Sequence, residues 1–252
     1  MEIIWHGTAT IEIRNGEDRL LFDPFLPLKG ADWEIPVEDF DGFQNILVTH
    51  GHFDHIVNLP EIVNRNSQVT IHCTAAPYNT LLEKGVPEKN LARVNYGDHL
   101  ELGSFSVDVY HSKHALLPKA DIRRLASIIF NKYIWNLIFI ARENKICTEN
   151  DETLLYVVRS CGKTVTVCGS LNFREDCEYP TDSDLLVLPY NGWNDNFPPA
   201  VRMINRLKPR KVFLSHWDNT FPPITGFIDR TPIKNAFPRL ILEAIPGEVL
   251  DI

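Results

Sequence analysis

THGHFDHI, residues 49–56, places three histidines and one aspartate within six positions, directly after the apolar run ILV. His50 and His52 lie two residues apart at the expected end of a strand, and the glycine between them permits a tight turn. Both imidazole rings can then reach one metal ion, while Asp54 and His55 follow half a turn later and face a neighbouring position. Imidazole and carboxylate groups suit zinc, iron or manganese better than copper(I) or calcium. The alternative is a polar loop whose histidines only form hydrogen bonds, but chance rarely produces this pattern.

Two further histidines end strand-like runs far from this cluster. His111 ends FSVDVYH, and His216 ends KVFLSH. Proteins of the α/β class hold functional side chains at strand ends, because the sheet keeps the strand end still while the loop varies. His111 and His216 are therefore candidates to complete the coordination shells. His114 competes with His111 for this role, but the strand-end position favours His111 and leaves His114 for the substrate pocket.

Strand-like and helix-like runs alternate along the chain, which argues for an α/β domain. The length of 252 residues suffices for one large domain with its own core, so we expect a single domain over 1–252. Strands are expected at 2–13 (two strands across a glycine turn), 19–25, 45–50, 68–73, 98–112 (two strands), 153–159, 163–168, 184–189 and 211–215, and helices near 58–66, 76–85 and 198–207.

A helical insertion is expected at about 115–150, centred on the apolar segment IRRLASIIFNKYIWNLIFI at 122–140. Its charged residues make it a poor membrane span. One interpretation is a core or dimer-interface helix. The other is a lid over the site, or an amphipathic face that meets lipid-like substrates.

The composition is that of an ordinary globular protein, at 44% hydrophobic and 23% charged residues. A net charge of -8 and a pI near 5.6 argue against a nucleic-acid partner, which requires clustered basic residues. The five cysteines are odd in number and show no CxxC spacing, which is typical of reduced thiols. The start of the chain, MEIIWHG, lacks the basic and long apolar regions of a signal peptide. We therefore expect a cytoplasmic protein.

The ordered set of motifs resembles the metallo-β-lactamase fold superfamily. Within it, the chain is most similar to the general metal-dependent hydrolases that include ascorbate-6-phosphate lactonase and the N-acyl phosphatidylethanolamine phospholipase D type. The resemblance covers most of the chain, through WHGTATIEI, LLFDPF, THGHFDHI, YHSKH, VTVCGSLNF, DLLVLPYNG and FLSHWD in this order.

The resemblance implies a four-layer αββα sandwich with the metal site at one edge. Carried over by position, the ligands of a first ion would be His50, His52 and His111. Those of a second ion would be Asp54, His55 and His216. Asp23 and Thr49 would support the ligands from behind by fixing the orientation of their rings.

The chain departs from the family pattern at one position. The resemblance implies a bridging aspartate after a glycine, but the chain carries Ser170 after Gly169. A hydroxyl is a much weaker ligand than a carboxylate, so we expect a weak or absent second metal, or a bridge rebuilt by another acid. Glu175 and Asp176 are candidates for that bridge, and the alternative is that they are solvated loop acids. A nucleophilic serine would need a base that the sequence does not assign.

These observations predict a metal-dependent hydrolase that uses metal-activated water on an ester, a lactone or a phosphodiester. Asp54 would orient the water and accept its proton. One or two divalent ions are expected, with zinc ahead of manganese or iron. The substrate is expected to be a small molecule, anionic or partly apolar, and the basic residues Lys113, Lys119, Arg123 and Arg124 are candidates to hold an anionic group. A homo-oligomer and a non-catalytic metal-dependent binding or sensing protein on the same fold both stay open.

Overall fold

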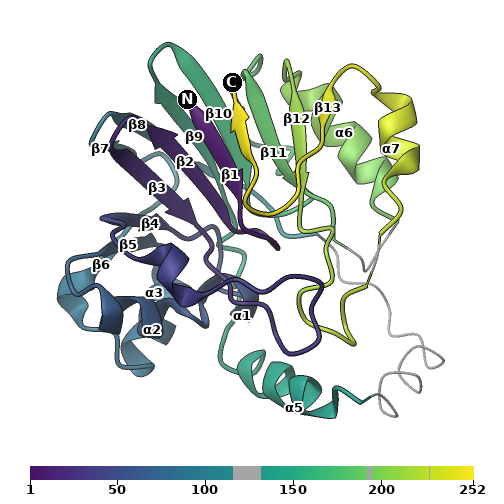
Figure 1. Cartoon of the computed structure of the whole chain (residues 1–252). Coiled ribbons are helices and arrows are strands. Elements are labelled where there is room, and N and C mark those ends of the chain that lie inside the picture. The colour runs from purple at the N-terminus through teal and green to yellow at the C-terminus, as the bar shows by residue number, and fades with distance from the viewer. Residues whose placement is uncertain (116–131, 192–194, 227) are drawn as a thin grey trace.

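The computed structural model describes residues 1–115, 132–191, 195–226 and 228–252, and it contains two seven-stranded sheets that pack face to face (Figure 1). The first sheet contains, in spatial order, β14 (Val249–Asp251), β1 (Glu2–Trp5), β2 (Ile11–Asn15), β3 (Asp18–Phe22), β4 (Asn45–Leu47), β5 (Thr70–Cys73) and β6 (Leu91–Arg93). The second contains β13 (Ile241–Leu242), β12 (Val212–Ser215), β11 (Leu185–Pro189), β10 (Lys163–Cys168), β9 (Leu154–Ser160), β8 (Phe105–His111) and β7 (His99–Leu102).

Helices cover the outer face of each sheet (Figure 1). The first sheet carries α2 (Leu59–Arg65) and α3 (Ala75–Glu83), whose apolar side chains share a buried cluster with β3, β4 and β5. The second carries α6 (Phe197–Leu207) and α7 (Thr231–Ala236), which share the main core with β11 and β12. Among the described residues, the remaining helices are the short α1 (Phe53–Ile56), α5 (Ile134–Glu143), and the 3-10 turns Val37–Phe40 and Glu88–Asn90. This arrangement confirms the predicted four-layer αββα sandwich.

Aromatic side chains hold the two sheets together. Trp5 of β1 meets Phe213 of β12 with ring centroids 5.7 Å apart, and Phe22 of β3 meets Tyr156 of β9 at the same separation. All four rings are fully buried. Edge-on aromatic pairs of this kind add about 0.5–1.5 kcal/mol each beyond their area burial. The Tyr156 hydroxyl also donates a 2.8 Å hydrogen bond to the carbonyl of Val48, so the core is tied directly to the loop that follows β4.

Parallel strands position the site. In the first sheet β3, β4, β5 and β6 run parallel, and in the second β10, β11, β12 and β13 do. The loops that follow β4, β10 and β12 leave at one edge of the sandwich, where His50, Ser170 and His216 line a common cavity. α/β sheets place their sites at the carboxyl ends of parallel strands in this way.

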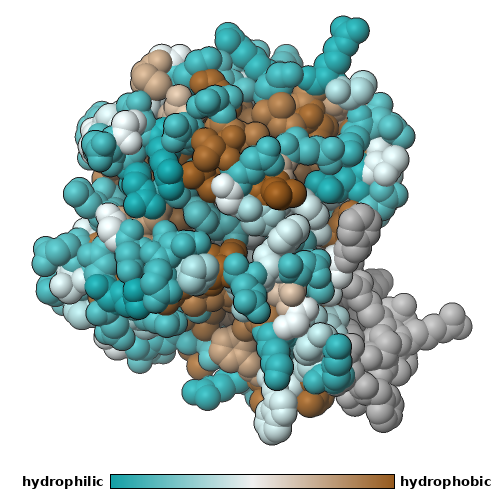
Figure 2. Space-filling view, viewed as in Figure 1, coloured by the Kyte–Doolittle hydropathy of each residue, from teal (hydrophilic) through white to brown (hydrophobic). Residues whose placement is uncertain are grey.

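The predicted insertion at 115–150 is only partly visible, because residues 116–131 lie outside the described part. Its second half contains α5, so the helix predicted up to residue 140 is present from Ile134. In Figure 1, α5 lies at the end of the molecule opposite the two termini. Figure 2 shows hydrophobic atoms among hydrophilic ones in that lower region. Within the described ranges, no helix is long and apolar enough to cross a bilayer.

A buried carboxylate, Glu12 of β2, provides a test of the fold. Its side chain is fully buried, and it accepts hydrogen bonds from Arg19 Nε at 2.7 Å and from His6 Nε2 at 2.9 Å, with Arg14 as a third partner. Burial raises the pKa of this carboxyl, but the bonds from His6, Arg14 and Arg19 outweigh burial and lower it to about 2.

We predict that Glu12→Gln destabilises the protein at pH 7 by about 3 kcal/mol, which corresponds to the drop in the Glu12 pKa from 4.5 to about 2. A carboxyl group whose pKa is lower in the folded than in the unfolded protein stabilises the fold at pH values above its unfolded-state pKa. This stabilisation is lost as the pH falls toward the pKa of the folded state. The difference in the free energy of unfolding between wild type and variant, measured with urea, should therefore decrease by about 1 kcal/mol per pH unit below 4.5. Glu17→Gln, at an exposed turn, should change little. A gap that does not vary with pH would contradict the assigned role of the charge.

Candidate metal centre

The loop after β4 carries the histidine motif into the site. His50 is buried, and His52 precedes the first residue of α1, which contains Asp54 and His55. Gly51 was expected to permit a tight turn, but the structure gives it a different role. A Cβ at this position would lie 2.2 Å from the carbonyl oxygen of Thr148, so glycine is required for the close approach of two backbone segments.

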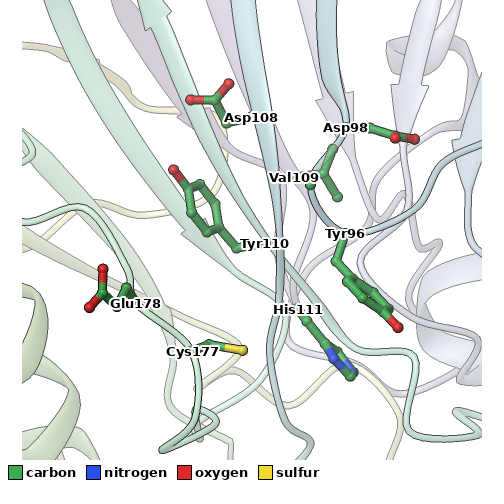
Figure 3. Close-up of a pocket in the computed structure, with 9 residues that line it drawn as sticks. Tyr96, Asp98, Asp108, Val109, Tyr110, His111, Cys177 and Glu178 are labelled. Atoms are coloured by element: carbon green, nitrogen blue, oxygen red, sulfur yellow. The ribbon is translucent and has the colours of Figure 1, made fainter.

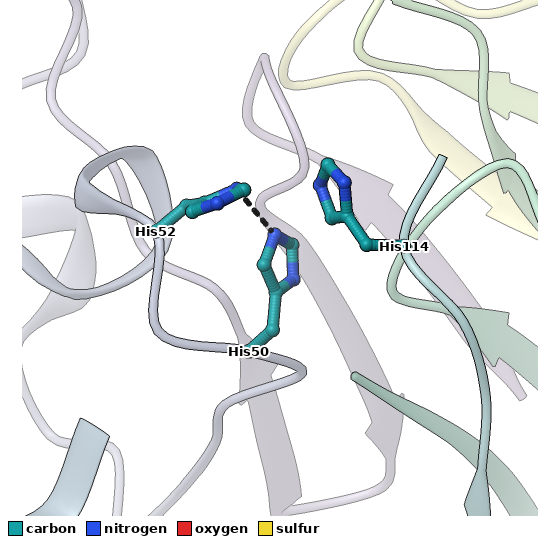
Figure 4. Close-up of side chains that lie close together, drawn as sticks. All are labelled: His50, His52 and His114. Carbon is teal, nitrogen blue, oxygen red and sulfur yellow. Dashed lines mark hydrogen bonds between the residues drawn. The ribbon is translucent and has the colours of Figure 1, made fainter. Parts of the chain in front are cut away.

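Three imidazoles form the first candidate triad. Donor atoms of His50, His52 and His114 all lie within 4.8 Å of one another. His50 Nε2 and His52 Nδ1 are 3.1 Å apart, and the His114 ring faces both, with centroids 5.0 Å from His50 and 4.5 Å from His52 (Figure 4). Three converging imidazoles are a typical set of zinc ligands.

His114, and not His111, completes this triad, which corrects the sequence-based preference. His111 Nε2 donates a 2.9 Å hydrogen bond to the carbonyl of Asp151, and its ring stacks on Tyr96 at 4.5 Å. It lines a separate cavity of about 380 Å³ (Figure 3). Side chains alternate between the faces of a strand, so His111 lies on the same face of β8 as the buried Val107 and Val109, but it is the last residue of the strand and is only partly buried. The chain needs three more residues to reach the site.

Asp54, His55 and His216 form the second candidate triad, whose donor atoms also lie within 4.8 Å of one another. Asp54 Oδ2 is 3.1 Å from His216 Nε2 and 3.7 Å from His55 Nε2. All three residues are buried. His216 Nδ1 is buried with no hydrogen-bond partner among the described residues. The nitrogen that faces Asp54 is Nε2, so Nε2 is the atom that would hold an ion shared with this carboxylate.

Asp23, directly after β3, supports both triads from behind, together with Thr49. Its Oδ1 accepts a 2.8 Å hydrogen bond from the Thr49 amide, and its Oδ2 accepts one of 2.7 Å from the Thr49 hydroxyl. The same Oδ2 lies 2.9 Å from His55 Nδ1. The Thr49 oxygen in turn lies 3.0 Å from His50 Nδ1.

This network sets which ring nitrogen of each histidine keeps a lone pair. Because the Thr49 hydroxyl donates to Asp23, its oxygen accepts from His50 Nδ1. Asp23 accepts from His55 Nδ1, and the carbonyl of Ala115 accepts from His114 Nδ1 at 2.7 Å. In these three rings Nε2 then keeps its lone pair and can act as a ligand, and His50 Nε2 uses that lone pair toward His52 Nδ1 at 3.1 Å. Such outer partners fix the tautomer of metal-binding histidines.

The charge states also suit metal binding. Burial lowers the pKa of His52 to about 4 and that of His50 well below its ordinary value. Burial raises the pKa of Asp54, but His55 and His216 outweigh this effect and lower it. Burial lowers the pKa of His55, and Asp23 and Asp54 more than offset it, so its pKa is raised. The first triad therefore holds neutral imidazoles and the second an ionised Asp54, which are forms that bind metals, whereas His55 favours its protonated form and would lose that proton to a bound ion.

Ser170 follows β10 and lines the same cavity as the triads. Its hydroxyl oxygen accepts a 2.9 Å hydrogen bond from the amide of Ala115, so it holds the segment next to His114. The candidate replacement acids lie elsewhere. Glu175 is paired with Arg202 at 2.6 Å and Asp176 with Arg174 at 3.1 Å, and both carboxylates are exposed. The structure therefore supports the interpretation of these two residues as loop acids.

A residue that the sequence analysis missed, Glu149, adds negative charge to the site. It lines the cavity, and its charge acts on His52 and His114. Both of its oxygens are used: Oε1 accepts from the Thr153 amide at 3.2 Å, and Oε2 from the Asp151 amide at 3.0 Å. No sequence motif marks Glu149, because it follows the insertion and reaches the site only through folding.

The cavity that contains both triads has a volume of about 640 Å³. Its described lining also contains the apolar side chains Phe53, Ile140, Phe221 and Ile224, and it contains neither lysine nor arginine. Lys113 lies on a different surface beside Arg174. The other basic candidates, Lys119, Arg123 and Arg124, lie outside the described residues.

The two histidines at the end of β8 give a direct test of this geometry. We predict that His114→Ala lowers metal affinity by more than about tenfold, because it removes a ring nitrogen from the first triad. His111→Ala should retain the metal, since its ring lies in another cavity. Metal content by plasma mass spectrometry after dialysis against a competing chelator measures both. Metal loss in the His111 variant alone would contradict the placement.

A family model described as a beta-lactamase superfamily domain matches residues 18–217. Among curated proteins, a UPF0173 metal-dependent hydrolase of Mesorhizobium japonicum is 29% identical over 119 residues, covering 46% of this chain and 48% of the relative. One from Pyrobaculum arsenaticum is 33% identical over 120 residues, covering 44% and 48%. The matched part thus spans about half the length of these curated relatives.

Solved structures match over nearly the whole chain. Igni18, a metallo hydrolase from Ignicoccus hospitalis, has a TM-score of 0.69 at 17% identity and covers 99% of this chain and 97% of its own. Zn(2+)-bound PqqB from Methylobacterium extorquens has a TM-score of 0.63 at 15% identity and covers both chains completely. At these identities the likeness shows the fold. Together with the family match over 18–217, it shows that the chain belongs to the metallo-β-lactamase superfamily.

Proposed function

We propose that this protein is a metal-dependent hydrolase of small molecules. The observation that carries the proposal is the convergence of two triads of metal-type ligands in a single cavity of about 640 Å³. Cavities of this size suit small-molecule ligands. The curated relatives bear the name metal-dependent hydrolase, which agrees with the proposal.

His50, His52 and His114 would hold one divalent ion, and Asp54, His55 and His216 a second. Zinc is the expected metal because imidazole nitrogens dominate the first set, with manganese or iron as alternatives. A divalent ion, when bound, would lower the pKa of a water molecule and polarise the substrate oxygen on which negative charge develops.

Asp54 is the proposed catalytic residue. Its carboxylate is ionised, buried, and held by His216, so it can orient an attacking water and accept its proton. The hydrogen bond from His55 to Asp23 keeps the neighbouring ring in position during this step. Asp23 and Thr49 act through these contacts and touch no substrate themselves.

An ester, a lactone and a phosphodiester are the candidate substrates, and the apolar side chains of the described cavity lining suit one with a partly apolar portion. Phe53, Phe221 and Ile224 provide an apolar wall for the remainder of such a substrate. We further infer a reducing, cytoplasmic location, because all five cysteines are free thiols.

Ser170 favours one alternative function. Ser170 stands where the family resemblance implies a bridging aspartate. The alternative function is therefore a non-catalytic, metal-dependent binding or sensing protein. The hydroxyl of Ser170 is engaged with the Ala115 amide, which is a structural role. The metal content per chain bears on the choice between hydrolase and binding protein. Two equivalents favour a hydrolase with a two-ion site, and one equivalent is compatible with a single-ion hydrolase or a binding protein.

We predict that the metal-replete protein hydrolyses a generic ester or lactone and that Asp54→Asn lowers kcat by about 10²–10⁴-fold, the usual contribution of a general base. Hydrolysis of p-nitrophenyl butyrate, a γ-lactone and bis(p-nitrophenyl) phosphate, each with added zinc or manganese, measures this. Asp176→Asn, which changes an exposed acid outside the cavity, is the matched control and should retain activity. A metal-replete protein that is inert on all three substrates would favour the binding protein instead.

A further inference from the structure

The solvent-facing side of α5, together with the residues just before and after the helix, is unusually apolar for a protein surface. Trp135 is 76% exposed and Ile138 is 53% exposed, with Ile134 and Ile146 beside them. The opposite side of the same helix is anchored, since Ile140 is buried and Asn136 donates hydrogen bonds to the carbonyls of Lys29 and Pro222. The exposed side chains thus lie on a helix that is held firmly in place. We call this surface the outer α5 face, made up of Lys132, Ile134, Trp135, Ile138, Arg142, Lys145 and Ile146.

The charges on this face have one sign. Lys132, Arg142 and Lys145 are exposed, and none of them forms an ion pair within the described residues. From residue 132 to residue 146 the only acid is Glu143, which is buried and paired with Lys84. The chain as a whole has a net charge of -8, so a purely basic face with exposed tryptophan and isoleucine stands apart from the rest of the molecule.

We propose that the outer α5 face docks onto an anionic lipid bilayer surface. Interfacial helices combine cations on their polar side with tryptophan and aliphatic residues that enter the headgroup region. The three cations match the negative potential of anionic lipids, and the apolar side chains gain by leaving water. With ten residues, α5 is too short to span a bilayer and suits a position in the interfacial plane.

Charge argues against a second copy of the chain as the occupant. A two-fold symmetric contact would place this basic face against an identical basic face of the partner. Like charges in a desolvated contact cost free energy, and the face has no exposed acid to offset them. An anionic surface avoids this cost.

Docking would bring the cavity close to the bilayer, because Ile140 and Asn144 of the same helical segment line it. The docking proposal does not depend on the proposed hydrolase activity. Its test measures binding to lipid, so it can fail or succeed independently of turnover.

Sedimentation with vesicles tests the proposal on the full chain. We expect binding to vesicles of phosphatidylcholine mixed with phosphatidylglycerol, much weaker binding to phosphatidylcholine alone, and loss of binding as salt rises from about 0.1 M to about 1 M. Arg142→Gln and Lys145→Gln should each weaken partitioning about fivefold. Trp135→Ala with Ile138→Ser should weaken it at least about tenfold.

The matched control is Ile245→Ser, which removes a 59% exposed isoleucine outside this face and should leave binding unchanged. All variants alter exposed side chains, and unchanged thermal unfolding by circular dichroism will show that they fold. Absence of vesicle binding would overturn the proposal, as would binding that the α5 variants do not weaken. A lipid-free dimer that Trp135→Ala dissociates would also overturn it, by assigning the face to a second copy.

Discussion

The carboxylate of Asp23 is the contact on which the rest of the site depends. It is buried between the ends of two adjacent parallel strands, β3 and β4, and it binds Thr49 through both oxygens and His55 through one. Asp23 adopts a left-handed backbone conformation, with φ of 46°, which is uncommon for a residue other than glycine. Hydrogen bonds to an ionised acceptor are about twice as strong as neutral ones, and they offset this local strain. Without them, the rings of His50 and His55 would lose both their orientation and their tautomer.

The two sheets contribute unequally to the site. The first sheet supplies His50, His52, Asp54 and His55 from one loop and one short helix, while the second supplies His114 and His216. The backbone amide of His216 is held across the sheets by the carbonyl of Thr8 at 2.7 Å. Neither triad is complete until the sandwich has closed. Binding of an ion to these residues would therefore be coupled to folding, and part of its binding free energy would stabilise the packed sheets.

One helix connects the cavity with the outside of the molecule. The inner side of α5 contributes Ile140 to the apolar wall of the cavity, and its outer side carries Trp135 and Ile138 into solvent. This explains why the segment 122–140 could be interpreted as a core helix or as a lid. A sequence pattern can show that apolar residues occur on more than one side of a helix. It does not show which of these sides faces the cavity and which faces solvent.

The sequence by itself indicated the family, the αββα fold and the histidine motif after β4, and the family resemblance implied the roles of Asp23, Thr49 and His216 near that motif. The histidine motif is local, because a strand, its end and the next residues lie within one continuous stretch of chain, whereas Asp23 and His216 belong to separate motifs at the ends of β3 and β12. Only the tertiary structure decided that His114 and not His111 completes the first triad, since His111 ends β8 and the place of His114 depends on the path of the chain after the strand.

The tertiary structure alone also placed Glu149 at the cavity, gave Ser170 to the Ala115 amide, and explained Gly51 by the backbone of Thr148. In each case the deciding contact joins residues far apart in the sequence, whose distance is set by packing and not by any local pattern.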